Sequence, residues 1–352
     1  MAAVPNSLKE MLSPRSTLTI LPNEMSSSLP EEEMLKKSLQ NPIKSGRFDE
    51  ERAKKIAIIM ADTTRFCSPF IRKLIISAEK KTDDIKIVCA HGSHVPSPPA
   101  FFQELLGEDL YSCYGKDIVL SSTQNPLSEY ESIGETKEGT PVELNKELLD
   151  RDLVISSLNV QPHYFAGYEG GAKSLLPGCS SLRTIVANHS KVIGNRNARE
   201  LRIDGNCLRE EINESSDLFL KFGIKHRIVD FTINRMQQVV GVGYGDPAAA
   251  HRYVAETYAK PIYAVKAHQA KFIVTIANGP GGRNLCQALK AAAFASNIAF
   301  KDANKKPVVF LFAGLQEGVG GEAFVHEMRR YGHLEGKPTK GRLRQLGLKD
   351  MK

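Results

Sequence analysis

A glycine-rich stretch between residues 162 and 190 gathers side chains that can do chemistry, and it reads PHYFAGYEGGAKSLLPGCSSLRTIVANHS. Glycine has no Cβ and tolerates positive φ, so paired glycines let the main chain approach a phosphate or a planar ring. Imidazoles exchange protons near neutral pH, and a lysine in apolar surroundings can act as a nucleophile or an anchor. The stretch therefore predicts a ligand-binding loop, whose reactive residues and glycines are His163, Gly167, Gly170, Gly171, Lys173, Ser174 and His189.

Further polar side chains follow two apolar runs nearer the N-terminus, Lys55 to Ala61 and Ile85 to Ala90. Both runs have the length and composition of strands that are covered on both faces. In a parallel sheet, ligands bind beyond the carboxyl ends of the strands. We therefore expect one edge of the sheet to hold Asp62, Arg65, His91 and His94.

The elements that position these residues alternate between strand and helix, which is typical of a parallel sheet. A third apolar strand, residues 152–158, leads into the glycine-rich stretch. Other strands are predicted near residues 17–21 (an edge strand), 119–120, 141–144, 227–233, 238–242, 263–277 and 307–313. Helices are predicted near residues 30–40, 68–80, 99–106, 206–217, 247–259, 283–300 and 322–331.

These patterns predict an α/β protein of two domains with the active site in the cleft between them. A larger N-terminal domain, residues 1–259, would hold the mostly parallel sheet, with irregular structure over residues 1–28. A smaller α/β domain, residues 260–352, would end in a short basic tail.

Composition narrows the function classes. The net charge of +7 is a mild excess over 352 residues, and no basic face interleaved with aromatic residues accompanies it, so we expect no nucleic-acid partner. The N-terminus lacks the pattern of a signal peptide, and no apolar run has the length of a membrane span. Six cysteines without a CxxC pair are typical of a reducing compartment, and we expect a cytoplasmic protein.

A generic phosphate-binding motif, G-x-x-x-x-G-K-[ST], nearly matches residues 167–174. Ala172 stands at the place of its last glycine, and Pro177 would end the helix that the motif needs within a turn. Both departures disfavour a nucleoside triphosphatase.

Five separated segments together resemble the nickel-dependent lactate racemase family. They are DTTR (62–65), AHGSH (90–94), HYFAGYEGGAKS (163–174), TIVANH (184–189) and NLCQALK (284–290), in the order that the family has them. The resemblance implies a cofactor, the nickel pincer nucleotide. This is a pyridinium-3-thioamide-5-thiocarboxylic acid mononucleotide that holds Ni(II) and is made by dedicated biosynthetic enzymes.

The resemblance also implies a role for each matching residue. Lys173 would form the thioamide with the cofactor, His189 would be the protein ligand to nickel, and His94 and His163 would be the acid and base. Arg65, Gln287 and Lys290 would bind substrate, and the remaining cofactor contacts would come from Asp62, Gly170, Gly171 and Ser174.

The implied activity is racemisation or epimerisation of a 2-hydroxy acid, lactate or larger, by proton-coupled hydride transfer through a 2-keto acid. Direct removal of the Cα proton beside a carboxylate is hard, whereas hydride transfer is easier when a base takes the hydroxyl proton. A neutral imidazole suits Ni(II) as the remaining donor. A lyase or dehydrogenase-like enzyme with the same cofactor, or a cofactor-binding protein without turnover, are the alternative readings.

Two departures from the family pattern lie on the substrate side. Cys286 precedes Gln287 where many members have an aromatic residue, and the chain contains no tryptophan. His91, next to the acid-base candidate His94, has no assigned role. The substrate is accordingly less defined than the cofactor.

Overall fold

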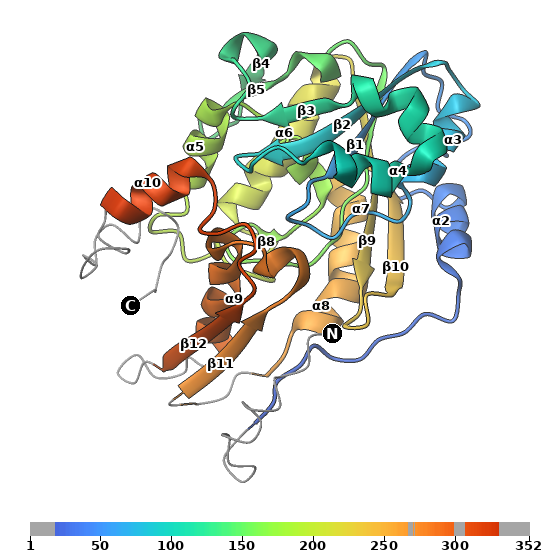
Figure 1. The fold of residues 1–352 in the computed structure, drawn as a ribbon. Helices are drawn as coiled ribbons and strands as arrows, with labels where there is room; N and C mark the ends of the chain where they lie inside the picture. The colour runs from blue at the N-terminus through green and yellow to red at the C-terminus, as the bar shows by residue number, and fades with distance from the viewer. Residues whose placement is uncertain (1–17, 267–269, 271, 299–306, 331–352) are drawn as a thin grey trace. The chain divides into compact units, whose positions relative to one another are not determined.

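The computed structural model describes residues 18–266, 270, 272–298 and 307–330 (Figure 1). The chain divides into two compact units. The large unit comprises residues 26–233 and 239–260, and the small unit comprises the remainder, residues 1–25, 234–238 and 261–352. The predicted domain boundary at 259/260 and the cleft between domains stay predictions.

A six-stranded sheet forms the centre of the large unit, with the strand order β10-β9-β6-β1-β2-β3 (Figure 1). Every neighbouring pair is parallel except β9 and β10, which form an antiparallel hairpin. The prediction of an α/β fold with a mostly parallel sheet is confirmed. The strands are β1 (Lys55–Ala61), β2 (Asp84–Gly92), β3 (Val119–Ser122), β6 (Leu153–Ser156), β9 (Lys225–Ile233) and β10 (Val239–Gly245).

Two apolar cores cover the two faces of this sheet because the side chains of β1 alternate between them. Ile56, Ile58 and Met60 pack in one core with the helices α2 (Glu31–Gln40), α3 (Ile71–Glu79) and α4 (Pro99–Tyr114). Ala57 and Ile59 pack in the other with β5 (Pro141–Asn145) and α6 (Cys207–Lys221). Each fully buried isoleucine contributes roughly 1.5–3 kcal/mol. The long apolar run of β1 thus fixes the sheet on both sides.

Smaller elements complete the large unit. β4 (Tyr130–Glu135) pairs with β5 as an antiparallel hairpin, and β7 (Pro162–His163) pairs with β8 (Gly167–Tyr168). α5 (Leu182–Ser190) begins at Ser181, whose side chain caps it by accepting from the Thr184 amide. α7 (Pro247–Val254) continues through a π-helical turn at Ala255–Ala259. α8 (Lys260–Tyr263) follows it and begins at the last residue of the large unit.

Several elements differ from the prediction. The helix predicted over residues 99–106 extends to Tyr114, because the chain resumes helical geometry after Gly107, whose φ is 73°. The sequence analysis did not predict α5. The edge strand at residues 17–21 was wrong, since residues 18–21 have no regular structure and Thr17 lies outside the described residues.

The small unit is also an α/β arrangement. β11 (Phe272–Ala277) runs parallel to β12 (Val308–Ala313), and the helices are α9 (Leu285–Ile298) and α10 (Glu322–Arg330). A short 3-10 turn, Gly279–Gly282, separates β11 from α9, as the glycines and proline of this segment predicted. In the part of the chain that the structure describes, no helix has the length and apolar character that crossing a membrane requires.

Candidate active site

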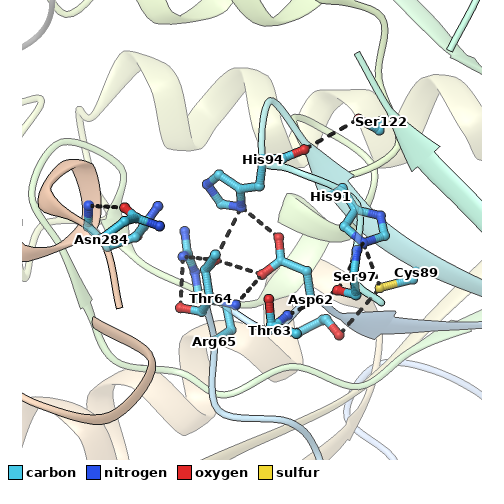
Figure 2. Close-up of polar contacts among 12 residues, drawn as sticks. Asp62, Thr63, Thr64, Arg65, Cys89, His91, His94, Ser97, Ser122 and Asn284 are labelled. Carbon is cyan, nitrogen blue, oxygen red and sulfur yellow. Dashed lines mark hydrogen bonds and ion pairs between the residues drawn. The ribbon is translucent and has the colours of Figure 1, made fainter. Parts of the chain in front are cut away.

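Asp62 and His94 form a hydrogen-bonded pair at the carboxyl ends of β1 and β2 (Figure 2). The two strands are neighbours, so the residues that follow them meet at one edge. Asp62 Oδ2 lies 2.6 Å from His94 Nδ1, and Asp62 Oδ1 accepts from the Thr64 amide at 2.8 Å and hydroxyl at 2.6 Å. The predicted meeting of these two strand ends is confirmed.

The ionisation of Asp62 determines which nitrogen of His94 carries the proton. Burial disfavours the carboxylate, but His94 and the hydrogen bonds outweigh it and hold the pKa of Asp62 well below its usual range. An ionised Asp62 accepts only, so His94 Nδ1 must donate. In the neutral ring the lone pair is therefore on Nε2.

Arg65 connects this pair to the glycine-rich stretch. Its Nη1 donates to the Thr64 hydroxyl at 2.8 Å, and its Nε lies 3.0 Å from Glu169 Oε1 (Figure 2 shows the Thr64 side). Two anchors fix the plane of the guanidinium, a group whose geometry matches a carboxylate.

His163 is buried on β7 and carries its proton on the other ring nitrogen from His94. Its Nδ1 accepts from the Ala166 amide at 3.0 Å, so in the neutral ring the hydrogen is on Nε2. The ring contacts Tyr164 and Phe165, with centroids 4.7 Å and 4.3 Å away. In their neutral forms, the two predicted acid-base residues thus present a lone pair on Nε2 of His94 and an N–H on Nε2 of His163.

Lys173 is buried in the 3-10 turn Gly171–Ser174 and pairs with Glu169. Its Nζ lies 2.8 Å from Glu169 Oε2. Burial lowers the pKa of Lys173 to about 7, although the Glu169 carboxylate acts in the opposite direction. Close to neutral pH, much of this amine is therefore an uncharged nucleophile.

The paired glycines let the loop approach its own sheet. Gly170 has φ 87°, and a Cβ there would lie 2.6 Å from Asp230 Oδ2 on β9. The Gly171 amide donates to the same oxygen at 2.6 Å. Ser174 is buried, with its hydroxyl 3.4 Å from His226 Nε2. The predicted cofactor contacts of Gly170, Gly171 and Ser174 stay predictions.

His189 lies in the last turn of α5, half-buried beside Phe165. The two ring centroids are 4.9 Å apart, and Phe165 also contacts His163, so both imidazoles border one phenyl ring. Glu211 on α6 holds the end of α5 by accepting from Asn188 at 2.8 Å and by pairing with Lys191.

His91 has structural partners. It is buried, and its Nε2 accepts from the Ser97 amide at 2.8 Å (Figure 2). This bond ties together the two ends of the loop that carries His94, which gives His91 the role that the sequence left open.

Two contributors to the site escaped the sequence analysis. Glu169 stands inside the glycine-rich stretch and contacts Arg65, Lys173 and His163, the last at 3.8 Å. Arg209 on α6 is fully buried and donates to three carbonyl oxygens of the loop, those of Ala166, Tyr168 and Gly170. The acidic character of Glu169 beside Lys173 was a visible signal, whereas nothing in the helical pattern of α6 pointed to Arg209.

The remaining predicted residues belong to the small unit. Gln287 and Lys290 lie on α9, and Lys290 Nζ donates to Gln287 Oε1 at 2.7 Å. The Asn284 side chain accepts from the Gln287 amide at 3.0 Å and so begins the helix. Cys286 lies between Asn284 and Gln287, and its amide donates a hydrogen bond to the Val319 carbonyl.

Within the described residues, no group of three or more His, Cys, Asp or Glu side chains is arranged to hold a metal ion.

The fold and the site define an α/β protein in which a sheet edge with Asp62 and His94 is linked by contacts to a loop with His163 and a buried lysine, Lys173. Residues 7–200 match the family described as lactate racemase N-terminal domain. The lactate racemase of Lactiplantibacillus plantarum is 30% identical over 315 residues, covering 85% of this chain and 70% of that protein. The lactate racemase of Thermoanaerobacterium thermosaccharolyticum is 31% identical over 306 residues, covering 84% and 69%. The chain belongs to the lactate racemase family.

Solved structures agree with this assignment. The lactate racemase apoprotein from Thermoanaerobacterium thermosaccharolyticum superposes with a TM-score of 0.76 at 26% identity, covering 94% of this chain and 80% of that chain. A protein from Thermotoga maritima has a TM-score of 0.57 at 16% identity over 72% of this chain and 65% of that chain, which shows the fold alone.

Proposed function

We propose that this protein is a racemase or epimerase of a 2-hydroxy acid, lactate or larger, that works by proton-coupled hydride transfer through a 2-keto acid. The observation that carries the proposal is the pair of histidines with complementary proton positions, joined to Arg65 and Lys173 by one chain of contacts. The family membership supports the same conclusion.

Neutral His94 is the proposed proton acceptor. Its Nε2 lone pair takes the hydroxyl proton of the substrate, and Asp62 stabilises the imidazolium that results. Because Asp62 is buried and ionised, its charge acts on the ring through little water.

His163 offers a hydrogen from Nε2 to the substrate oxygen. Its Nδ1 is occupied by the Ala166 amide, so the ring acts first as a hydrogen-bond donor. To accept a proton at Nε2 in the opposite direction, the ring must move its own proton to Nδ1 and release that amide. Racemisation in both directions thus requires a small opening at Ala166.

Arg65 is the predicted anchor for the substrate carboxylate. Thr64 and Glu169 fix its orientation before any ligand arrives, which reduces the entropy lost on binding. Gln287 and Lys290 are proposed to bind the substrate as well. Cys286, smaller than an aromatic residue, favours a bulkier acid than lactate at this position.

The residues of this chain fit the nickel pincer nucleotide. Lys173 provides a buried amine with a pKa of about 7, which favours nucleophilic attachment, and His189 provides a half-buried imidazole of the type that binds Ni(II). When bound, the cofactor supplies the hydride acceptor, which amino-acid side chains cannot be. Lys173 and His189 would hold it, and its biosynthetic enzymes are the expected partners.

The test uses protein purified from a host that makes the cofactor. We expect nickel in the metal analysis, an added mass on Lys173 in intact and peptide mass spectra, and interconversion of enantiomers within a chiral panel of 2-hydroxy acids. Unmodified Lys173 without nickel in such a preparation would contradict the proposal. If the mass of the acid changes, the reaction is a lyase or dehydrogenase-like reaction and not racemisation.

A further inference from the structure

Glu169 occupies the centre of the site, although the proposed mechanism assigns it no step. It is buried, and its two carboxylate oxygens serve different partners. Oε2 lies 2.8 Å from Lys173 Nζ, while Oε1 lies 3.0 Å from Arg65 Nε and 3.8 Å from His163 Nε2. A single carboxylate therefore contacts the attachment lysine, the substrate anchor and one acid-base residue.

The backbone of Glu169 is fixed on both sides. Its amide donates to the Gln161 carbonyl at 2.8 Å, and its carbonyl lies 3.0 Å from His251 Nε2 on α7. Burial lowers the pKa of His251, so this ring is neutral and donates from Nε2. A side chain on so fixed a backbone keeps its carboxylate against the Lys173 amine.

We propose that Glu169 is the residue that takes the proton from Lys173 when the lysine is joined to the cofactor. The inference rests on the proposed function, because it concerns the attachment of that cofactor. It assigns to Glu169 a chemical task in loading, besides holding Arg65 and His163 in position.

The step balances as an acyl or thioacyl transfer. The neutral Lys173 amine forms a C–N bond to the carboxyl-type carbon of the ligand, and the bond from this carbon to its leaving group breaks. The leaving group departs as an anion with the electron pair of that bond. The Glu169 carboxylate, 2.8 Å from the amine, takes the proton that the attacking nitrogen loses. The products are the amide or thioamide, the leaving-group anion and the Glu169 carboxylic acid.

If Glu169 were only an ion-pair partner of Lys173, it would slow the attack by the lysine instead of speeding it. A carboxylate that only stabilises the ammonium would slow attack, because it raises the pKa of Lys173. The two roles are distinguished at alkaline pH, where the amine is neutral with or without Glu169. There only an acceptor for the proton that the nitrogen loses during attack still affects the rate.

The experiment measures acylation of Lys173 by the phenyl thioester of nicotinic acid, with the protein prepared without cofactor. Peptide mass mapping quantifies the acyl group on Lys173, and thiophenol release gives the rate from about pH 6 to about pH 10. The variants are Glu169→Gln and the matched control Glu51→Gln. Glu51 is likewise a buried carboxylate paired with a lysine and an arginine, Lys225 and Arg227, outside the site. Lys173→Met identifies the signal that belongs to this lysine.

We expect Glu169→Gln to lower the plateau rate at alkaline pH about 10- to 100-fold while moving the inflection of the rate to lower pH. Glu51→Gln should change neither. A plateau in Glu169→Gln that equals or exceeds the wild type would overturn the proposal and leave Glu169 as an ion-pair partner.

Glu169→Asp covers the case in which the glutamine variant fails to fold, as judged by its thermal unfolding. It keeps the carboxylate but moves it away from Lys173 by the length of one methylene. We therefore expect the acylation rate at alkaline pH to lie below that of the wild type, with the inflection of the rate at the same pH. A plateau equal to that of the wild type would count against the proposal.

The thioester contains no nickel. The acylation rate measured with it therefore does not depend on whether the protein is a racemase. Nickel content and the interconversion of enantiomers test the racemase activity separately.

Discussion

At the scale of single residues, the site depends on where each proton is held. Asp62 places the hydrogen of His94 on Nδ1, and the Ala166 amide places that of His163 on Nε2. Two rings of identical chemistry therefore begin with different roles. Lys173 also depends on where a proton is held, because burial lowers the pKa of its amine and makes the amine reactive close to neutral pH.

Asp62→Asn tests the role of the Asp62–His94 pair. The amide cannot stabilise an imidazolium by charge and allows the other tautomer of His94, so we expect kcat to fall about 10²- to 10⁴-fold. Nickel content and Lys173 modification should be retained, as metal analysis and mass spectrometry would show. Asp109→Asn, which removes an exposed carboxylate paired with Arg72, is the control. A wild-type rate in Asp62→Asn would remove this pair from the mechanism.

At the scale of elements, Arg209 on α6 organises the loop that carries His163, Glu169 and Lys173. It donates to three loop carbonyls from a fully buried position, and burial lowers its pKa to about 10, so it remains charged. The loop in turn approaches β9 through Gly170 and Gly171. Helix, loop and strand thus form one support for the reactive side chains.

Arg209→Met should be far more destabilising than the loss of an exposed arginine. Three buried carbonyls would lose their donor, so we expect the free energy of unfolding to fall by about 3–5 kcal/mol. Arg252→Met, which breaks the exposed pair of Arg252 with Asp204, should cost less than about 1 kcal/mol. Urea unfolding of both variants provides the comparison, and equal midpoints would show that Arg209 does not support the loop.

At the scale of the whole molecule, burying the charged form of Lys173 lowers the free energy of unfolding. The folded-state pKa of about 7 lies below the ordinary value of 10.5, so between these values the unfolded chain binds a proton that the folded chain does not. Stability therefore rises with pH across this window. Below pH about 7 the full cost of burying the charged form is present.

Lys173→Met should remove this pH dependence. In protein prepared without cofactor, the difference in unfolding free energy between the wild type and Lys173→Met should change by up to about 1.4 kcal/mol per pH unit in the window. Urea unfolding at a series of pH values measures it. Lys55→Met, which removes a more exposed lysine paired with Asp150, should keep the wild-type slope. A difference that is constant with pH would mean that Lys173 is not desolvated.

Much of this arrangement was predictable from the sequence. The apolar runs at 55–61 and 85–90 identify neighbouring parallel strands, and Asp62 and His94 follow them, so their meeting at one edge required only the alternation of strand and helix. The glycine-rich stretch likewise indicated a loop of close approach, and five separated motifs between residues 62 and 290 indicated the family. Local periodicity and chain order are enough for such predictions, because the hydrophobic effect acts on patterns rather than on particular partners.

Only the tertiary structure decided which group each reactive side chain contacts. Arg209 contacts carbonyls about 40 residues earlier in the chain, Glu169 joins Arg65 from another strand end, and the tautomers of the histidines follow from single hydrogen bonds. The physical reason is that burial shifts pKa values and that a hydrogen bond forms only when the donor–acceptor distance lies within a range of a few tenths of an ångström. Such contacts exist only once the chain has folded.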